Sequence, residues 1–202
     1  MSAAGTNRDW SKVDPFALGI SGKIGSGKTT LITNLLKEYD FSVASYGAFF
    51  RGLAASRNLP NNRETFQSLT EEYLRDQNHN GLAAEVVKSS NWDGKKSLLV
   101  DGVRHIASIS AISRLTHPLP FFVVFLNVPE ETRISRIGKR DGLPPDTVKL
   151  HDRHESEKLV TNEVRSAADL IVSENETEAA IEKIFSFLGH IRRGEGDLGR
   201  SS

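Results

Sequence analysis

Short runs of consecutive apolar residues alternate along the chain with segments of helical periodicity. Runs such as SLLVD and FFVVFLNV are apolar at nearly every position, which is typical of strands that are buried on both faces. Because helical segments separate these runs, the pattern predicts an α/β fold, a three-layer sandwich around a five-stranded parallel sheet. The strands are expected at residues 16–21, 41–45, 97–101, 121–128 and 170–172.

The helices are predicted from apolar residues that recur three or four positions apart. After the first expected strand, for example, Leu31, Ile32, Leu35 and Leu36 share one helical face. The helices are expected at residues 28–39, 48–57, 63–75, 81–89, 106–115, 130–140, 147–167 and 178–188.

The order of these elements favours a single domain over residues 14–189, because the chain shows no linker and no internal repeat. Within this domain, residues 47–90 are expected to form a small helical lobe, and residues 138–153 a short lid. Residues 1–13 and 190–202 carry mixed charges and lack periodicity, so both ends are expected to be flexible tails.

Composition and charge exclude several function classes. Among the 202 residues, 26 Lys and Arg balance 26 Asp and Glu, so the formal net charge at pH 7 is zero. This balance argues against an extended nucleic-acid surface. Cys is absent, which excludes disulfides, thiolate catalysis and Cys-based zinc sites, and agrees with a cytoplasmic location. The longest apolar run is too short to cross a membrane, so no membrane association is expected.

A glycine-rich segment at residues 22–29, GKIGSGKT, matches the phosphate-loop pattern G-x-x-x-x-G-K-[ST] at every fixed position. It follows a predicted strand and opens a predicted helix, which is the context that this motif requires. Its glycines allow successive backbone N–H groups to surround an anion, and the positive end of the helix dipole points at the same place. The segment therefore predicts a P-loop NTPase fold that binds Mg²⁺ and a nucleoside triphosphate.

Two side chains of this segment have expected roles of their own. Lys28 would reach the β- and γ-phosphates, and the hydroxyl of Thr29 would join the Mg²⁺ shell. The residues expected around the phosphates are Gly22, Gly25, Ser26, Gly27, Lys28, Thr29 and Thr30.

Asp101 ends an apolar strand, in the sequence LLVD. Ligands collect at the carboxyl ends of parallel strands, and an Asp there can hold a metal-bound water beside the phosphates. An Asp-Gly pair is also a frequent turn, so Asp101 could simply end the strand. With a phosphate loop nearby, we expect it to contact Mg²⁺ through water.

Triphosphate binding alone fits a kinase, a GTPase switch or a motor ATPase. Arginines gather at the ends of the expected elements, and their planar guanidinium groups suit phosphate oxygens. Each of them could also be an ordinary surface residue. These arginines are Arg51, Arg63, Arg75, Arg104, Arg133, Arg136, Arg140 and Arg153.

Four segments resemble, in the right order, motifs of the P-loop nucleoside monophosphate kinase superfamily. YGAFFR at 46–51 is similar to G-D-L-L-R, and DGVR at 101–104 is similar to D-G-x-P-R without the proline. EETRISRIGKR at 130–140 resembles the helix that leads into the lid, and HDR at 151–153 resembles the lid's Asp/Arg pair. The resemblance covers about residues 14–189 and points to the cytidylate-kinase-like and dephospho-CoA-kinase-like branches.

The resemblance implies ATP and Mg²⁺ as cofactors and a role for each matching residue. Gly47, Arg51 and Arg104 would bind the acceptor in the lobe at 47–90. Arg136 would lie beside the adenine and the triphosphate. The residues expected to act on the transferring phosphoryl group are Lys28, Asp101, Arg140 and Arg153.

The chain departs from the family pattern at the acceptor site. Ala48 stands where the family commonly has Asp, and residues 43–51 contain no carboxylate. A hydroxyl acceptor benefits from a base that takes its proton, whereas a phosphate acceptor is already an anionic nucleophile. The missing carboxylate therefore favours a small phosphorylated acceptor, most simply a (deoxy)nucleoside monophosphate.

Two other functions stay open at this stage. The first is a kinase of a hydroxyl acceptor, such as dephospho-CoA, another metabolite or a nucleic-acid end, with Asp101 as the base. The second is a triphosphate-dependent switch, although the chain lacks the N/T-K-x-D motif of GTPases. A monomer and a homodimer are equally compatible with the sequence.

Overall fold

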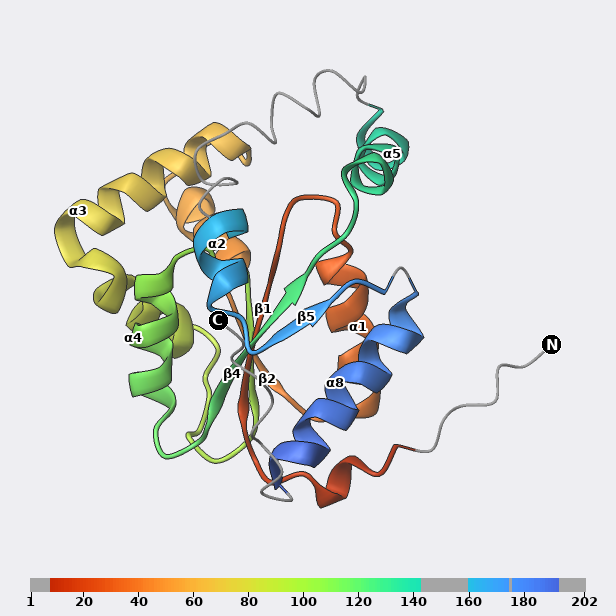
Figure 1. The fold of residues 1–202 in the computed structure, drawn as a ribbon. Helices are drawn as coiled ribbons and strands as arrows, with labels where there is room; N and C mark the ends of the chain where they lie inside the picture. Colours follow the sequence, from red (N-terminus) through yellow and green to blue (C-terminus); the bar gives the residue numbers. More distant parts are fainter. Residues whose placement is uncertain (1–7, 143–159, 175, 193–202) are drawn as a thin grey trace.

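The computed structural model describes residues 8–142, 160–174 and 176–192, and its core is one parallel sheet (Figure 1). The order of the five strands is β2-β3-β1-β4-β5, which confirms the predicted α/β fold. The strands are β1 (Ala17–Gly22), β2 (Ser42–Ser45), β3 (Leu98–Asp101), β4 (Phe121–Leu126) and β5 (Leu170–Val172).

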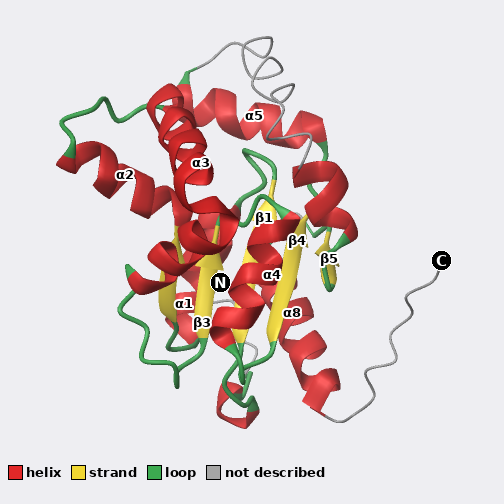
Figure 2. Cartoon of the chain, turned by 90° about the vertical axis from the view of Figure 1, so that its left-hand side faces the viewer, coloured by secondary structure: helices red, strands yellow, loops and turns green. Residues whose placement is uncertain are grey.

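Helices cover both faces of this sheet (Figure 2). α1 and α8 lie on one face, whereas α3 and α4 lie on the other, and α2 lies next to α3 near the carboxyl ends of the strands. The helices are α1 (Lys28–Glu38), α2 (Tyr46–Ser56), α3 (Arg63–Lys88), α4 (Ile106–Thr116), α5 (Glu130–Asp141) and α8 (Thr177–Arg192), with short helical turns η1 (Trp10–Lys12) and η2 (Val160–Val164). Among the described residues, none of these helices has the length and apolar character needed to cross a membrane.

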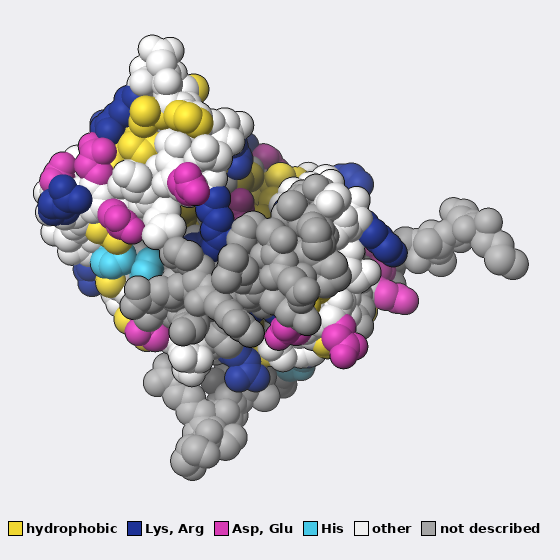
Figure 3. Space-filling view, turned by 90° about the horizontal axis from the view of Figure 1, so that it is seen from above, with side chains coloured by type: hydrophobic (Ala, Val, Ile, Leu, Met, Phe, Trp, Pro, Cys, Tyr) yellow, Lys and Arg dark blue, Asp and Glu magenta, His cyan; other side chains and the backbone are white. Residues whose placement is uncertain are grey.

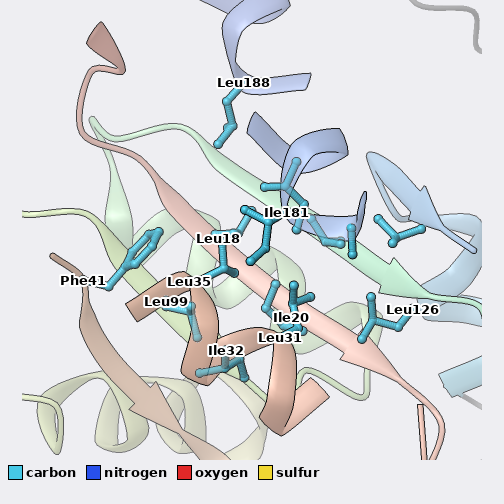
Figure 4. Close-up of a cluster of buried hydrophobic side chains, with 14 of the residues drawn as sticks. Leu18, Ile20, Leu31, Ile32, Leu35, Phe41, Leu99, Leu126, Ile181 and Leu188 are labelled. Carbon is cyan, nitrogen blue, oxygen red and sulfur yellow. The ribbon is translucent and has the colours of Figure 1, made fainter. Parts of the chain in front are cut away.

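The core lies on both sides of β1, whose side chains alternate between the two helical layers. Leu18 and Ile20 point toward α1 and α8, where they pack with Leu35 and Ile181 (Figure 4). Gly19 faces the other layer, where an added Cβ would come within 2.8 Å of the Phe121 ring. The absence of a side chain at this position therefore allows Phe121 to pack against the central strand.

The register of the sheet places the ends of three neighbouring strands together. Asp101 of β3 pairs with Ile20 of β1 on one side and with Ser45 of β2 on the other. The segments that leave β1, β2 and β3 therefore begin at one edge of the sheet, the edge at which ligands of parallel α/β proteins bind.

One structural difference from the sequence prediction concerns α3. The pattern predicts two helices with a break after residue 75, but a single element runs from Arg63 to Lys88 and bends at Asn78, which has a φ of 56° and a ψ of −176°. The bend is held by contacts to α4: His79 Nδ1 lies 3.3 Å from Ser108 Oγ, and Arg114 donates to Asn80 at 2.6 Å. The interruption of the helical pattern is therefore present in the structure, but the chain makes a sharp bend there and does not form a loop.

A second difference concerns the ends of the chain. Residues 8–13 are not a free tail, because Trp10 is buried against Tyr39 and Phe185. The Arg8 guanidinium donates to Glu38 of α1 at 2.6 Å, and it also forms ion pairs with two glutamates of α8. At the other end, α8 continues to Arg192, past the expected boundary at 190. Local periodicity could not reveal the contacts of Arg8 and Trp10, because their partners are distant in sequence.

Candidate active site

The loop between β1 and α1 has the backbone conformation that the glycine-rich motif predicts. Gly22, Gly25 and Gly27 have φ values of 143°, 76° and 91°, a region that residues with a Cβ rarely adopt. A Cβ on Gly25 would also lie 2.8 Å from the Arg133 carbonyl oxygen. Both the conformation and the space at this loop therefore require glycine.

Lys28 lies folded over this loop at the start of α1. Its Nζ donates to the carbonyl oxygens of Gly22 at 2.5 Å and Lys23 at 2.9 Å, and lies 3.4 Å from the hydroxyl of the buried Ser26. These contacts hold the ammonium group at the mouth of the loop. Thr29, one position further along α1, is exposed.

Two arginines of α5 support the loop from the opposite side. Arg133 is buried, with 3% of its surface exposed, and donates to the Ile24 carbonyl at 3.1 Å. Arg136 donates to the Ser26 carbonyl at 3.4 Å, and an added Cβ on Gly27 would lie 3.3 Å from its Nη1. Arg136 thus lies beside the loop, and its predicted place beside the adenine and the triphosphate stays a prediction.

Asp101 and Thr29 present the oxygen ligands that Mg²⁺ prefers. Both line the same cavity, together with Lys28. The Ser45 hydroxyl donates to Asp101 Oδ2 at 3.0 Å and accepts from the backbone N–H of Ala48, so one residue caps α2 and orients the carboxylate. The donor set fits Mg²⁺, and among the described residues there is no cluster of three His, Asp or Glu side chains that would suggest another metal.

A cavity of about 510 Å³ extends from the phosphate loop to the lobe formed by α2 and α3. It contains five residues that the sequence predicts for the site: Lys28, Thr29, Gly47, Asp101 and Arg104. The structure therefore brings the triphosphate loop and one side of the expected acceptor site together. Lys and Arg side chains gather near the middle of this end of the molecule, between acidic and histidine side chains (Figure 3).

Other predicted residues lie outside the cavity lining. Arg51 is exposed on α2, with its guanidinium 3.4 Å from the place where a Gly47 Cβ would stand. Thr30 and Arg140 are also exposed. Arg153, like the part of the expected lid from residue 143 onward, lies outside the described residues.

Buried and half-buried polar side chains, including His105, Ser108 and Tyr46, form the part of the cavity lining that we call the floor. His105 and Ser108 line it, and the rings of His105 and His79 have centroids 4.9 Å apart. Burial lowers the pKa of both imidazoles, and the proximity of His79 lowers that of His105 further. Burial also raises the pKa of Tyr46, which lines the same floor, to about 12. These groups are therefore neutral at physiological pH.

A second cavity of about 390 Å³ lies on the other side of the phosphate loop. Its lining includes Lys23 of the loop, Asn127 after β4, Arg133 of α5 and Ser173 after β5. Both cavities include residues of the phosphate loop, Lys23 in this one and Lys28 and Thr29 in the first, but only the first also contains Asp101 and Arg104.

Comparison with known proteins gives a family for this arrangement. A family model described as an AAA domain matches residues 21–151, and a cytidylate kinase from Thermoplasma volcanium is 32% identical over 142 residues, 69% of this chain and 68% of that protein. The chain belongs to the family of this AAA domain model, which lies within the nucleoside-monophosphate-kinase-like P-loop kinases. A cytidylate kinase from Thermoplasma acidophilum is 28% identical over 141 residues, 69% of each chain.

Solved structures agree with the fold of this P-loop kinase. A gluconokinase from Sinorhizobium meliloti superposes with a TM-score of 0.55 at 15% identity, covering 91% of this chain and 97% of that one. Identity at this level shows the shared fold alone. Family membership itself identifies the chain as a kinase, so the interpretation as a non-catalytic switch is set aside.

Several site residues of this P-loop kinase were missed by the sequence prediction. Arg133 had no assigned role, although Arg133, Arg136 and Arg140 lie three and four positions apart and so share one helical face. Ser45 gave no local signal, because its carboxylate partner is 56 residues away. The wall that α3 contributes could have been detected from its periodicity; it comprises Arg63, Phe66, Gln67, Thr70, Glu71 and Leu74.

Proposed function

We propose that this P-loop kinase transfers the γ-phosphoryl group of ATP to the phosphate of a nucleoside monophosphate. The observation that carries this proposal is the single cavity that Lys28 and Thr29 share with Arg104 and α3. A donor phosphate held at the loop and an acceptor phosphate held by Arg104 would meet in it. In the reaction, the bond from the γ-phosphorus to its bridging oxygen breaks, and an acceptor phosphate oxygen forms the new bond.

The charges along the cavity support a phosphorylated acceptor. Arg63 and Arg104 both line it, and guanidinium groups bind phosphate oxygens through paired hydrogen bonds. Neither β2 nor the first half of α2 offers a carboxylate that could accept a proton from a hydroxyl. A phosphate acceptor needs no such base, because its oxygen already carries the negative charge that attacks phosphorus.

Thr29 and Asp101 would hold Mg²⁺ at the loop end of the cavity, with Asp101 acting through water. When bound, Mg²⁺ neutralises charge on the phosphates. Lys28 would stabilise negative charge on the transferring group, and the carbonyl contacts that it now makes show how close its Nζ already is to the loop. Ser45 would keep the Asp101 carboxylate oriented. Arg136 lies on the loop side, where it would face the triphosphate.

The names of the matching relatives narrow the acceptor. Two cytidylate kinases align with about two thirds of this chain, so cytidine monophosphates are the first acceptors to test. The lobe at 47–90, which provides α2 and α3, would bind the nucleoside. Arg51, Arg140 and Arg153 keep the roles that the family resemblance implies as part of this proposal.

A second acceptor class is supported by Asp101. Its carboxylate lines the cavity and could accept a proton from a substrate hydroxyl. In that reaction the hydroxyl oxygen would attack phosphorus while its proton passed to Asp101 Oδ1 or Oδ2. Replacement of Asp101 by Asn would then abolish transfer to the hydroxyl acceptor through loss of the base.

The proposal is tested by following ADP and phosphorylated product with ATP, Mg²⁺ and a panel of acceptors. The panel contains ribo- and deoxyribonucleoside monophosphates, dephospho-CoA and nucleic acid with free hydroxyl ends. We expect nucleoside diphosphate to form in equal amount to ADP. Lys28→Ala serves as the inactive variant, and Lys37→Ala on the exposed side of the same helix serves as its matched control. Product from a hydroxyl acceptor alone would overturn the proposal in favour of the second class.

A further inference from the structure

The part of α3 before its bend at Asn78, the first arm, forms a wall of the cavity with one of its faces. Arg63, Gln67, Thr70, Glu71 and Leu74 all line it, and their spacing places them along a single stripe of the helix. Helix α3 packs against α2 and α4, and α2 and α3 meet at the end of the sheet where the phosphate loop begins (Figure 2). This stripe therefore faces whatever molecule occupies the acceptor side of the cavity.

The stripe carries opposite charges at its two ends. Arg63 is the first residue of α3, and Glu71 follows it by eight positions, which is about 12 Å along a helix. A carboxylate repels a phosphate group, whereas Lys28, Arg63 and Arg104 attract one. The other carboxylate of the lining, Asp101, would face Mg²⁺ under the proposed function, so an acceptor would direct its phosphate toward the cations and its other end toward Glu71.

Glu71 is positioned by its neighbour on the same helix face. Gln67 Nε2 donates to Glu71 Oε1 at 3.2 Å. This contact directs the amide N–H toward the carboxylate, and the atoms that remain for a ligand are then mainly acceptors, namely Glu71 Oε2 and Gln67 Oε1. The pair is suited to a ligand group that donates hydrogen bonds.

Apolar side chains in the lining of the same cavity suit a flat ring. Tyr46 and Phe50 of α2, together with Phe66, Leu74 and Leu82 of α3, line the same cavity. The His105 imidazole on the floor adds no positive charge that would attract the phosphate there, since burial lowers its pKa. Aromatic and aliphatic walls around a hydrogen-bonding edge are the features by which proteins recognise nucleobases.

From this arrangement we propose that Glu71, oriented by Gln67, recognises an exocyclic amino group on the base of the acceptor. The inference rests on the proposed function and makes it more specific, because the preferred acceptor is a nucleotide whose base donates a hydrogen bond at this edge. Cytosine presents its N4 amino group there, and a carboxylate accepts from it. Uracil has a carbonyl oxygen at the same position, which would face the carboxylate lone pairs. Glu71 is thus a specificity residue, and Gln67 is a positioning residue.

The test compares CMP and UMP, which have the same size and charge but differ at this group. Values of kcat/KM for both acceptors are measured with the wild type, Glu71→Gln and Glu72→Gln. Glu72 is the matched control: it neighbours Glu71 on α3 but pairs with Arg57 outside the cavity. We expect the wild type to prefer CMP by about 10-fold or more, because a hydrogen bond to a charged group is lost with UMP.

The glutamine amide can donate to a carbonyl oxygen, so we expect Glu71→Gln to lower the preference for CMP by about 10-fold, mainly through the acceptor KM. The KM for ATP should stay unchanged, and Glu72→Gln should keep the wild-type preference. Gln67→Ala should reduce the preference less than Glu71→Gln does. Thermal unfolding of the variants checks that each is folded.

Different kinetic results would contradict the role of Glu71 and the proposed kinase function. Transfer to both CMP and UMP with equal kcat/KM, or an unchanged preference in Glu71→Gln, would overturn the role of Glu71 and leave the kinase function intact. A folded wild-type protein that binds ATP but phosphorylates no nucleoside monophosphate would overturn both proposals.

Discussion

The two sides of the cavity are built in different ways. On the donor side, eight consecutive residues form the loop, and their glycine backbone conformations determine its shape. On the acceptor side, the wall is assembled from side chains of α2, α3, the end of β3 and the start of α4. The donor side therefore depends on local backbone geometry, whereas the acceptor side depends on long-range packing.

This difference in construction affects which ligands each side of the cavity can bind. A loop of fixed shape binds a group that all nucleoside triphosphates share, the polyphosphate chain. A wall made from separate side chains can change one residue at a time and so adapt to different acceptors. Under the proposed function, the loop would therefore bind any nucleoside triphosphate, and α3 would determine the choice of acceptor. Four substitutions would test this division, and they follow from the largest expected effect to the smallest.

Replacement of Lys28 by Ala should have the largest effect on transfer. The ammonium group lies at the loop mouth, and loss of a preorganised cation that stabilises the transferring group costs about 1,000-fold in kcat. Steady-state rates of product formation check this value against Lys37→Ala. Retention of wild-type rates in Lys28→Ala would show that the loop does not act on the transferring group.

Replacement of Gly25 by Ala tests the backbone requirement on the donor side. The new Cβ would lie 2.8 Å from the Arg133 carbonyl oxygen at a φ of 76°, so the loop must shift. Strain of this kind corresponds to about a 10- to 100-fold loss in kcat/KM for ATP. Gly52→Ala is the control, because a Cβ there meets no atom within 4 Å. Equal ATP kinetics in the two variants would contradict the requirement.

Replacement of Arg104 by Met should weaken the acceptor side alone. Loss of a charged hydrogen bond to the acceptor phosphate should raise the KM for the acceptor by about 10-fold or more. The KM for ATP should change little, because the loop is formed without Arg104. Arg75→Met, at an exposed position of α3 outside the cavity lining, provides the comparison. An increase in the ATP KM equal to that for the acceptor would remove the distinction between the two sides.

Replacement of Arg8 by Ala should leave both KM values unchanged and reduce stability only. The guanidinium is almost fully buried among Glu38, Glu178 and Glu182, so its loss should cost about 2 kcal/mol in the free energy of unfolding. Urea denaturation measures this cost, with Lys12→Ala in the exposed part of the same segment as the control.

The cost of losing Arg8 should also depend on pH. The hydrogen bond from Arg8 lowers the pKa of Glu38 in the folded protein, with a further contribution from Trp10. The stability from this pair is therefore present above the usual carboxyl pKa and is lost as the pH falls through the folded value. The difference in unfolding free energy between wild type and Arg8→Ala should shrink in acid. A constant difference would mean that Arg8 acts through packing and not through the carboxylates.

The same division explains how much the sequence could predict. The five strands, the loop at 22–29 and the position of Asp101 follow from local patterns, and the structure agrees with them. The motif predicts Arg51 at the acceptor phosphate, but a motif does not determine where a long side chain points, and this one is exposed and not among the residues that line the cavity.

Long-range contacts account for most of what was missed. The sequence pattern places Trp10 and Arg8 in a tail, because their partners on α1 and α8 lie 28 or more residues away. Ser45 is an ordinary helix cap until β3 brings Asp101 beside it. Arg133 lies among charged residues in sequence, yet α5 buries it against the phosphate loop. Each of these residues is defined by tertiary packing, which local periodicity does not encode.

We propose that this kinase moves a phosphoryl group from the loop to a phosphate held by the opposite wall. The most direct measurement uses ATP labelled at the γ-phosphate, Mg²⁺ and CMP, and asks where the label goes. We expect it in the β-phosphate of CDP, with formation dependent on Lys28 and weakened by loss of Arg104. Label that appears in inorganic phosphate at a rate independent of any acceptor would contradict the account.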